Sequence, residues 1–275
     1  MTGARALPTR VVRDGRAVRG TRALPEEVPV ALVYDGTTQA VMMASPLQIE
    51  DFARGFTLTE GIIDGVDEIE SLEIVVHDRG IEARMWLAGD RAEDLAARRR
   101  AALGPVGCGL CGIDSLDGAL RELPAVTARL ALSPAQTARA TGALRAGQVL
   151  HDRTRAVHGA GFFVPERGIV LLREDVGRHN ALDKLVGALA AEGIDPATGA
   201  AVVTSRLSVD MVQKVAMVGI PVLIGVSAPT ALAVETARAA GVTLIGLARD
   251  DGYEVFTMPG DDPGTQDGES ASDVA

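Results

Sequence analysis

The chain has 275 residues, of which 47% are hydrophobic and 23% charged, and this composition excludes a disordered or fibrous protein. The formal net charge of −10 disfavours nucleic acid as the main partner, because an acidic body repels phosphates. The charge is unevenly distributed, since residues 1–24 carry +5 and residues 259–275 carry −5.

The chain has two cysteines, Cys108 and Cys111. Two cysteines three positions apart cannot staple a secreted scaffold, and they cannot complete a four-cysteine zinc site. The first 30 residues are rich in arginine and lack the apolar run of a signal peptide. The longest apolar stretch, 220–234, is interrupted and too short to cross a bilayer. We therefore expect a reduced, cytoplasmic protein with no metal and no membrane segment.

The N-terminal part is predicted to mix strands with helices. Residues 1–24 show no clear apolar periodicity, which predicts a mobile basic arm. Apolar runs that flank Asp35-Gly36 predict a hairpin, and Ser45-Pro46 predicts the start of a helix that ends near Gly61. The further predicted elements of this part are strands at 71–77 and 81–87 and a helix at 91–102.

The C-terminal part alternates strands and helices about every 20 residues, which is typical of βαβ units and a mostly parallel sheet. Strands are predicted at 169–172, 200–204, 221–226, 242–248 and 253–257. Helices are predicted at 133–144, 180–191, 208–218 and 229–240, the last capped by Ser227. The fold class is therefore α/β, with a C-terminal mostly parallel sheet flanked by helices and a smaller α+β part before it.

This pattern divides the chain into four predicted parts. A mobile basic arm covers 1–24, and an α+β part covers 25–125 and ends in the loop with the two cysteines. An α/β part that binds the ligand covers 126–258, and a disordered acidic tail covers 259–275.

The cysteine pair lies in a segment, 104–112, that contains four glycines. Asp114 or Ser115 can cap a following helix, and a thiol just before a helix N-terminus has a stabilised thiolate. Four interpretations stay open on spacing alone. The pair can be two small buried residues, half of a zinc site completed by His151, His158 or a partner chain, a thioredoxin-like dithiol, or a carrier of sulfur or acyl groups.

Ligands of such sheets bind beyond the carboxyl ends of the strands. This places the loops at 175–180, 204–206, Ser227 and 249–252 on one edge, which we call the rim. The polar cluster 174–180 is either a helix cap with surface salt bridges or a contact for a ligand or subunit through Arg178 and His179. Together with Arg206 and Arg249, Arg178 suits an anionic ligand such as a pyrophosphate.

Several segments together resemble the FdhD family of formate dehydrogenase accessory sulfurtransferases. They are Gly55–Ile63, Cys108–Gly112, Glu174–Gly187 (EDVGRHNALDKLVG), Met211–Lys214 and Ser227–Ala233. The resemblance covers roughly residues 26–258, and the EDVGRHNALDK block is its most specific part.

The resemblance implies a sulfur carrier. Family members take sulfur from a cysteine desulfurase as a persulfide and pass it to the molybdenum bis(molybdopterin guanine dinucleotide) cofactor of formate dehydrogenase. Carried over by position, Cys108 would bear the persulfide and Cys111 would assist or resolve it. The residues implied to contact the cofactor are Leu247, Ala248, Arg249, Asp250, Asp251 and Gly252. The resemblance also implies a cytidine-deaminase-like C-terminal part and a homodimer.

Two departures from the family's pattern affect the expected cofactor contacts. Arg155-Ala156 stands where the family usually has Gly-Gly, and Asp250-Asp251 adds negative charge to the implied cofactor loop. Two alternative functions also stay open. The first is a chaperone that binds and delivers the molybdenum cofactor without sulfur transfer. The second is a dithiol oxidoreductase that uses both cysteines.

Overall fold

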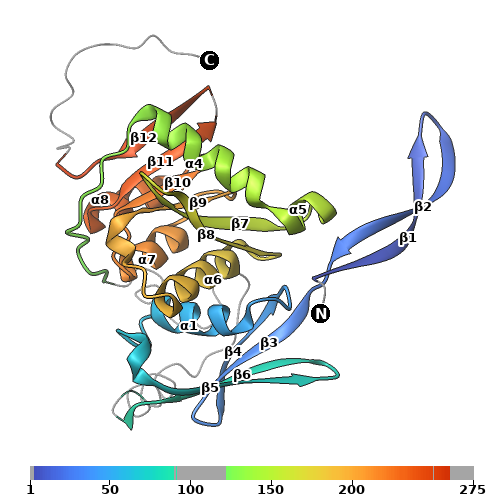
Figure 1. The fold of residues 1–275 in the computed structure, drawn as a ribbon, viewed down its shortest axis with the longest axis horizontal. Helices are drawn as coiled ribbons and strands as arrows, with labels where there is room; N and C mark the ends of the chain where they lie inside the picture. Colours follow the sequence, from blue (N-terminus) through green and yellow to red (C-terminus); the bar gives the residue numbers. More distant parts are fainter. Residues whose placement is uncertain (1–2, 90, 92–121, 250, 261–275) are drawn as a thin grey trace.

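The computed structural model describes residues 3–89, 91, 122–249 and 251–260. These residues form a four-stranded sheet, a six-stranded sheet and a separate two-stranded hairpin. In Figure 1, helix α1 (Ile49–Thr59) lies between the small sheet and helix α6 (Arg178–Ala191), which in turn covers the large sheet. The predicted helix at 91–102, the cysteine pair and the tail from 261 onward lie outside the described residues.

The small sheet has the strand order β4-β3-β6-β5, in which β3 and β6 are parallel. Its strands are β3 (Val28–Tyr34), β4 (Thr37–Ala44), β5 (Ile69–His77) and β6 (Gly80–Leu87), and the short helix η1 (Val66–Glu68) precedes β5. Asp35 and Gly36 have φ angles of +50° and +76°, as a tight hairpin turn requires, so the predicted hairpin is confirmed. Leu32 and Met85 of the inner face are buried in one cluster with Phe52 of α1.

The large sheet has the order β12-β11-β10-β9-β7-β8. Its strands are β7 (His158–Val164), β8 (Gly168–Asp175), β9 (Ala200–Val203), β10 (Val222–Gly225), β11 (Thr243–Arg249) and β12 (Gly252–Thr257). Strands β8 to β11 run in one direction, whereas β7 and β12 run against them. The predicted α/β class with flanking helices is confirmed, and the sheet is mixed. The cytidine-deaminase-like topology stays a prediction.

Helices cover both faces of the large sheet. They are α4 (Pro134–Gly147), α5 (Val149–Thr154), α6, α7 (Val209–Met217) and α8 (Ala231–Ala240), and the short helix η2 (Pro196–Thr198) precedes β9. Ala200 and Val202 of β9 are buried with residues of α4, whereas Ala201 and Val203 are buried with residues of α6, α7 and α8. Because successive side chains of a strand point to opposite faces, burial on both sides explains the all-apolar sequence of β9.

Two helix starts differ from the prediction for local reasons. Helix α1 begins at Ile49, because Gln48 adopts a left-handed backbone (φ +48°) and Ser45 is used in a buried contact described below. Helix α8 is capped by Thr230, whose Oγ1 accepts from the Ala233 N–H at 3.2 Å, and not by Ser227. The backbone oxygen of Ser227 instead accepts from the Leu247 N–H at 3.3 Å.

The structure corrects the interpretation of residues 1–24. The predicted mobile arm is an antiparallel hairpin of β1 (Ala4–Arg13) and β2 (Arg16–Pro25). Its turn is Asp14-Gly15, with φ angles of +49° and +75°. This is the same dipeptide and the same conformation as at Asp35-Gly36.

Strand β7 was also missed, because its glycines have low strand propensity. A Cβ at Gly159 would lie 2.7 Å from Nε2 of Gln148, so a glycine there permits the close approach of this buried side chain.

Helices α1 and α6 cross in direct backbone contact. A Cβ at Gly55 would overlap the carbonyl oxygen of Asp183, and a Cβ at Gly187 would overlap the carbonyl oxygen of Asp51. Each glycine therefore faces the backbone of the other helix, and no larger residue fits at either position.

We predict that Gly55→Ala destabilises the protein by about 3 kcal/mol, because the obstructing atoms are backbone and cannot move without separating the helices. Urea unfolding measures this loss. The matched control is Gly89→Ala, which meets no atom within 4 Å and should change stability by less than about 0.5 kcal/mol. Equal stability of the two variants would contradict the contact.

Candidate functional site

The predicted rim is formed as expected. Strands β8, β9, β10 and β11 end at Asp175, Val203, Gly225 and Arg249 on one edge of the sheet, and β7 begins there at His158. Backbone bonds join the loops beyond these ends, including Val226 N–H to Val203 O at 3.3 Å. The Gly159 N–H also donates to Oγ1 of Thr204 at 2.9 Å. The rim is thus a continuous surface built from several loops.

The loop implied to bind the cofactor connects β11 with β12 on this rim. Leu247 has a left-handed backbone (φ +52°), and the pairing of the two strands shifts between Gly246 and Arg249. This irregularity leaves Arg249, Asp251 and Gly252 exposed, whereas Ala248 is buried. Asp250 lies outside the described residues. The loop therefore presents one guanidinium beside one described carboxylate.

Helix α6 begins at the rim with Arg178 and His179. Burial, with the nearby charges of Arg178 and Lys214, lowers the pKa of His179 to about 4, so its imidazole is neutral at pH 7. Burial and Arg178 also lower the pKa of half-buried His158. Nε of Arg178 and Nε2 of His179 are buried and have no hydrogen-bond partner among the described residues. The start of α6 therefore offers one cation and a neutral imidazole.

Asp175, at the end of β8, is fully buried and holds the rim to the N-terminal part. One carboxylate oxygen accepts from Nζ of Lys184 at 2.6 Å and from the Ser45 N–H at 2.9 Å. The other accepts from the Gly177 N–H at 2.8 Å and from Nδ2 of Asn180 at 3.0 Å. Every one of these bonds has a charged acceptor in a site without solvent, which makes them strong.

Lys184 and Asn180 complete this network on the side of the small sheet. Nζ of Lys184 also donates to the Ser45 carbonyl at 2.9 Å, and Nδ2 of Asn180 donates to the Met43 carbonyl at 2.8 Å. Lys184 is 0% exposed, and burial lowers its pKa even though Asp175 favours its charge. Asp175, Asn180 and Lys184 of the EDVGRHNALDK block therefore join β8 and α6 to the end of β4 and to the segment between β4 and α1.

The second lysine, Lys214 of α7, forms a similar buried network with a different set of partners. Its Nζ lies 2.9 Å from Oδ1 of Asp183 and 2.8 Å from Oε1 of Glu60, and it donates to Oγ1 of Thr59 at 3.0 Å. Burial opposes the charge of Lys214, but Asp183 and Glu60 outweigh it and raise its pKa. This network joins α7, α6 and the end of α1.

The structure therefore corrects the first interpretation offered for the 174–180 cluster, whereas a contact through Arg178 and His179 stays a prediction. Asp175 and Asn180 are neither a helix cap with surface salt bridges nor ligand contacts, because their polar groups are buried and bonded within the protein. Arg178 and His179 begin α6 at the rim, and Nε2 of His179 lies 3.8 Å from Oδ2 of Asp210 in α7. The sequence signal that could have identified these buried networks is the lysine count, since only 2 of the 27 basic residues are lysines. Both lysines lie where a compact ammonium is buried.

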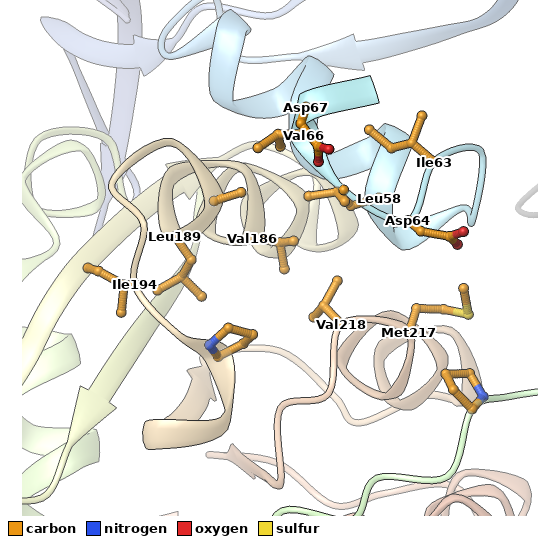
Figure 2. A pocket seen from close by; sticks show the side chains of 14 residues that line it. Leu58, Ile63, Asp64, Val66, Asp67, Val186, Leu189, Ile194, Met217 and Val218 are labelled. Atoms are coloured by element: carbon orange, nitrogen blue, oxygen red, sulfur yellow. The ribbon is translucent and has the colours of Figure 1, made fainter. Parts of the chain in front are cut away.

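An apolar cavity lies at the end of α6 that is remote from the rim, as Figure 2 shows. This cavity of about 640 Å³ is lined by apolar side chains of α1, α6 and the end of α7, including Leu58, Leu189 and Met217. Asp64 is also part of its lining and forms an ion pair with Arg91, and Pro124 lines another part. The described chain therefore stops before residue 92 and resumes at 122 beside this cavity.

Cys108 and Cys111 belong to residues 92–121 and lie outside the described residues. Helix α6 has 14 residues and is therefore about 21 Å long. It separates the rim at its first residue from the cavity at its last turn. The segment with the thiols thus joins the described protein at the end of α6 that is remote from the rim.

Neither a membrane span nor a metal site stands out in the part of the chain that the structure describes. None of its helices is long and apolar enough to cross a bilayer. No three histidine, cysteine, aspartate or glutamate side chains within it are grouped as metal ligands would be.

Comparison with known proteins gives a consistent result. Residues 25–261 match the profile of the FdhD/NarQ family. The chain is 51% identical over 254 residues to a protein of Agrobacterium fabrum named sulfur carrier protein FdhD, which covers 92% of this chain and 94% of that protein. A protein of the same name from Brucella abortus is 52% identical over 241 residues, covering 87% and 90% of the two chains.

A solved structure supports the fold. The crystal structure of a protein from Desulfotalea psychrophila, assigned as a formate dehydrogenase accessory protein, matches with a TM-score of 0.71. The two chains are 25% identical, and the match covers 93% of this chain and 97% of the other.

We predict that Lys184→Met destabilises the protein by about 3–5 kcal/mol, because it leaves the buried Asp175 carboxylate without its countercharge. The double variant Asp175→Asn/Lys184→Met should lose less than the sum of the two single variants, which urea unfolding of all four proteins measures. Additive losses would contradict a coupled pair. As a control, Arg145→Met breaks the exposed Arg145–Asp152 pair and should leave the unfolding midpoint nearly unchanged.

Proposed function

Because this chain belongs to the FdhD/NarQ family, we propose that it is a sulfur carrier that supports formate dehydrogenase. The observation that carries this proposal is its 51–52% identity, over about nine-tenths of its length, to proteins named sulfur carrier protein FdhD. The presence of two cysteines in the C-x-x-C spacing is consistent with that chemistry.

In the proposed reaction a cysteine desulfurase donates the sulfur. The Cys108 thiolate attacks the terminal sulfur of the desulfurase's persulfide, a new S–S bond forms, and the thiolate of the desulfurase leaves. Cys111 then attacks the inner sulfur of the Cys108 persulfide and releases hydrosulfide to the acceptor. This second step leaves a Cys108–Cys111 disulfide, which a dithiol reductant restores to two thiols.

The proposed acceptor is the molybdenum bis(molybdopterin guanine dinucleotide) cofactor, bound as a substrate at the rim. Its pyrophosphates match the guanidinium groups of Arg178, Arg206 and Arg249, which stand at or beyond the ends of β8, β9 and β11. The neutral imidazoles of His158 and His179 add hydrogen-bonding groups without adding charge. Asp251 opposes an anion in the same loop, so we expect Arg249 to dominate the contact there.

The length of the chain permits transfer between the two ends of α6. Glu122, the first described residue after the thiols, lies eleven positions beyond Cys111. Eleven residues span at most about 36 Å when extended, which exceeds the length of α6. The proposal also includes that the protein forms a homodimer and that it delivers the cofactor to formate dehydrogenase, as the family resemblance implies.

We predict that incubation with a cysteine desulfurase and cysteine adds one sulfur atom to the wild type, and that Cys108→Ala abolishes this addition. Cys111→Ala should still accept the sulfur but release it slowly. Intact-protein mass spectrometry measures the adduct, and formate dehydrogenase activity in cells without another copy measures delivery. Full activity with Cys108→Ala would contradict the role of Cys108. Cofactor binding with no sulfur adduct on either cysteine would favour the chaperone alternative.

We also predict that Arg249→Ala weakens binding of GDP, a probe for the guanine and pyrophosphate groups of the cofactor, by about tenfold. Isothermal titration calorimetry measures the affinity. Arg167→Ala is the matched control, because Arg167 is also exposed but lies in the turn between β7 and β8, at the edge opposite the rim. Equal affinity of wild type and Arg249→Ala would show that the loop does not bind the pyrophosphate.

A further inference from the structure

The apolar cavity at the last turn of α6 has no role in the proposed sulfur chemistry. Figure 2 shows Val186 and Leu189 of α6 on one side of it and Met217 and Val218 on the other. Its volume of about 640 Å³ lies within the range of natural ligand pockets, about 300–1,000 Å³. Because protein interiors are close-packed and apolar surface is most stable away from water, such a cavity favours an apolar occupant.

The described chain reaches this cavity on both sides of residues 92–121. On one side, Arg91 forms an ion pair with Asp64, which is part of the cavity lining. On the other side, Leu123 packs against the core formed with α6 and α7, and Pro124 lines the cavity. The two ends of the described chain that flank 92–121 are therefore fixed beside the same cavity.

The sequence between the thiols and Pro124 supplies apolar side chains. Ile113, Leu116 and Leu120 are spaced i, i+3 and i+7, which is the pattern of one apolar helix face. Leu120 precedes Pro124 by four positions, and four residues span at most about 13 Å. A side chain tethered this closely has an effective concentration of about millimolar or more at the cavity, which favours it over an occupant from solution.

We propose that Leu116 and Leu120, which follow the thiols in the sequence, occupy the apolar cavity between α1, α6 and the end of α7. The contact itself does not depend on sulfur chemistry. Its consequence for the thiols, given next, rests on the proposed function.

This contact shortens the tether that carries the thiols. Cys108 lies fourteen positions before Glu122 but only eight before Leu116. When Leu116 occupies the cavity, the largest distance between Cys108 and its attachment point falls from about 46 Å to about 26 Å. Both thiols are thereby concentrated at the end of α6 that is remote from the rim, where a desulfurase can meet them without contacting the bound cofactor.

Hydrogen–deuterium exchange of the full chain tests the contact. Ala190→Trp fills the cavity from α6 and leaves the proposed occupant unchanged, because Ala190 is a half-buried residue of the lining. Amides of residues 113–121 should exchange at least about tenfold faster in this variant than in the wild type, since a displaced segment loses its protection. The matched control Ala239→Trp, at an exposed alanine of α8, should exchange as the wild type does.

A neutral apolar dye, Nile red, tests the cavity from the other side. Leu116→Gln/Leu120→Gln should empty the cavity and increase the fluorescence of the dye, whereas adding Ala190→Trp to this variant should abolish the increase. The matched control Leu95→Gln/Leu103→Gln makes the same chemical change before the thiols. It should bind no more dye than the wild type.

Four results would overturn the proposal. They are equal exchange of 113–121 in the wild type and Ala190→Trp, equal dye binding by the wild type and Leu116→Gln/Leu120→Gln, an emptied cavity in the Leu95/Leu103 control, and protection that disappears on dilution from about 100 μM to about 1 μM. The last result would assign the cavity to a second copy. Circular dichroism checks that each variant folds. Sulfur loading by the desulfurase is measured on the same samples, and its failure in a wild type with a protected 113–121 segment would reject the carrier function but not the contact.

Discussion

The buried ion pair of Asp175 and Lys184 holds the rest of the structure in place. It ties the end of β8 and the start of α6 to Ser45, which directly follows β4, an edge strand of the small sheet. Two charges without solvent contact are stable only when each finds further polar partners, and here backbone groups supply them. The position of the rim relative to the small sheet therefore depends on this ion pair, on the bonds that Asn180 and Lys214 add, and on the glycine-mediated crossing of α1 and α6.

The consequence for function is a rigid scaffold between two ends of one helix. The rim, with Arg178 and Arg249, forms at the start of α6, and the segment with the thiols leaves the described chain near its last turn. The side chains that fix α6 are buried, so the groups that face the rim are positioned by rigid elements. Such an arrangement suits the proposed function, in which one bulky anionic molecule is held while the thiols meet a separate donor.

Much of this fold could be predicted from the sequence, and the exceptions have physical causes. The apolar runs of β9, β10 and β11 and the Ser133 cap of α4 are local signals, and they placed those elements correctly. The β1–β2 hairpin was missed although Asp14-Gly15 carries the same turn signal as Asp35-Gly36, because its strands alternate arginine with small residues and bury little. The rim could be predicted because parallel topology brings strand ends together. The buried role of Asp175 and Lys184 could not, since a charged cluster in sequence gives no indication of its partners at Ser45, 130 residues away.

The scarcity of lysine has a practical consequence for experiments on this protein. Both lysines of the chain are buried, with Lys184 at 0% and Lys214 at 5% exposure. Acetylation or ubiquitination of a lysine therefore requires local opening of the fold, and an amine-reactive crosslinker finds no accessible ε-amino group on the folded chain. Labelling of Lys184 would instead report the separation of α6 from the N-terminal part, and labelling of Lys214 would report the separation of α7 from the end of α1.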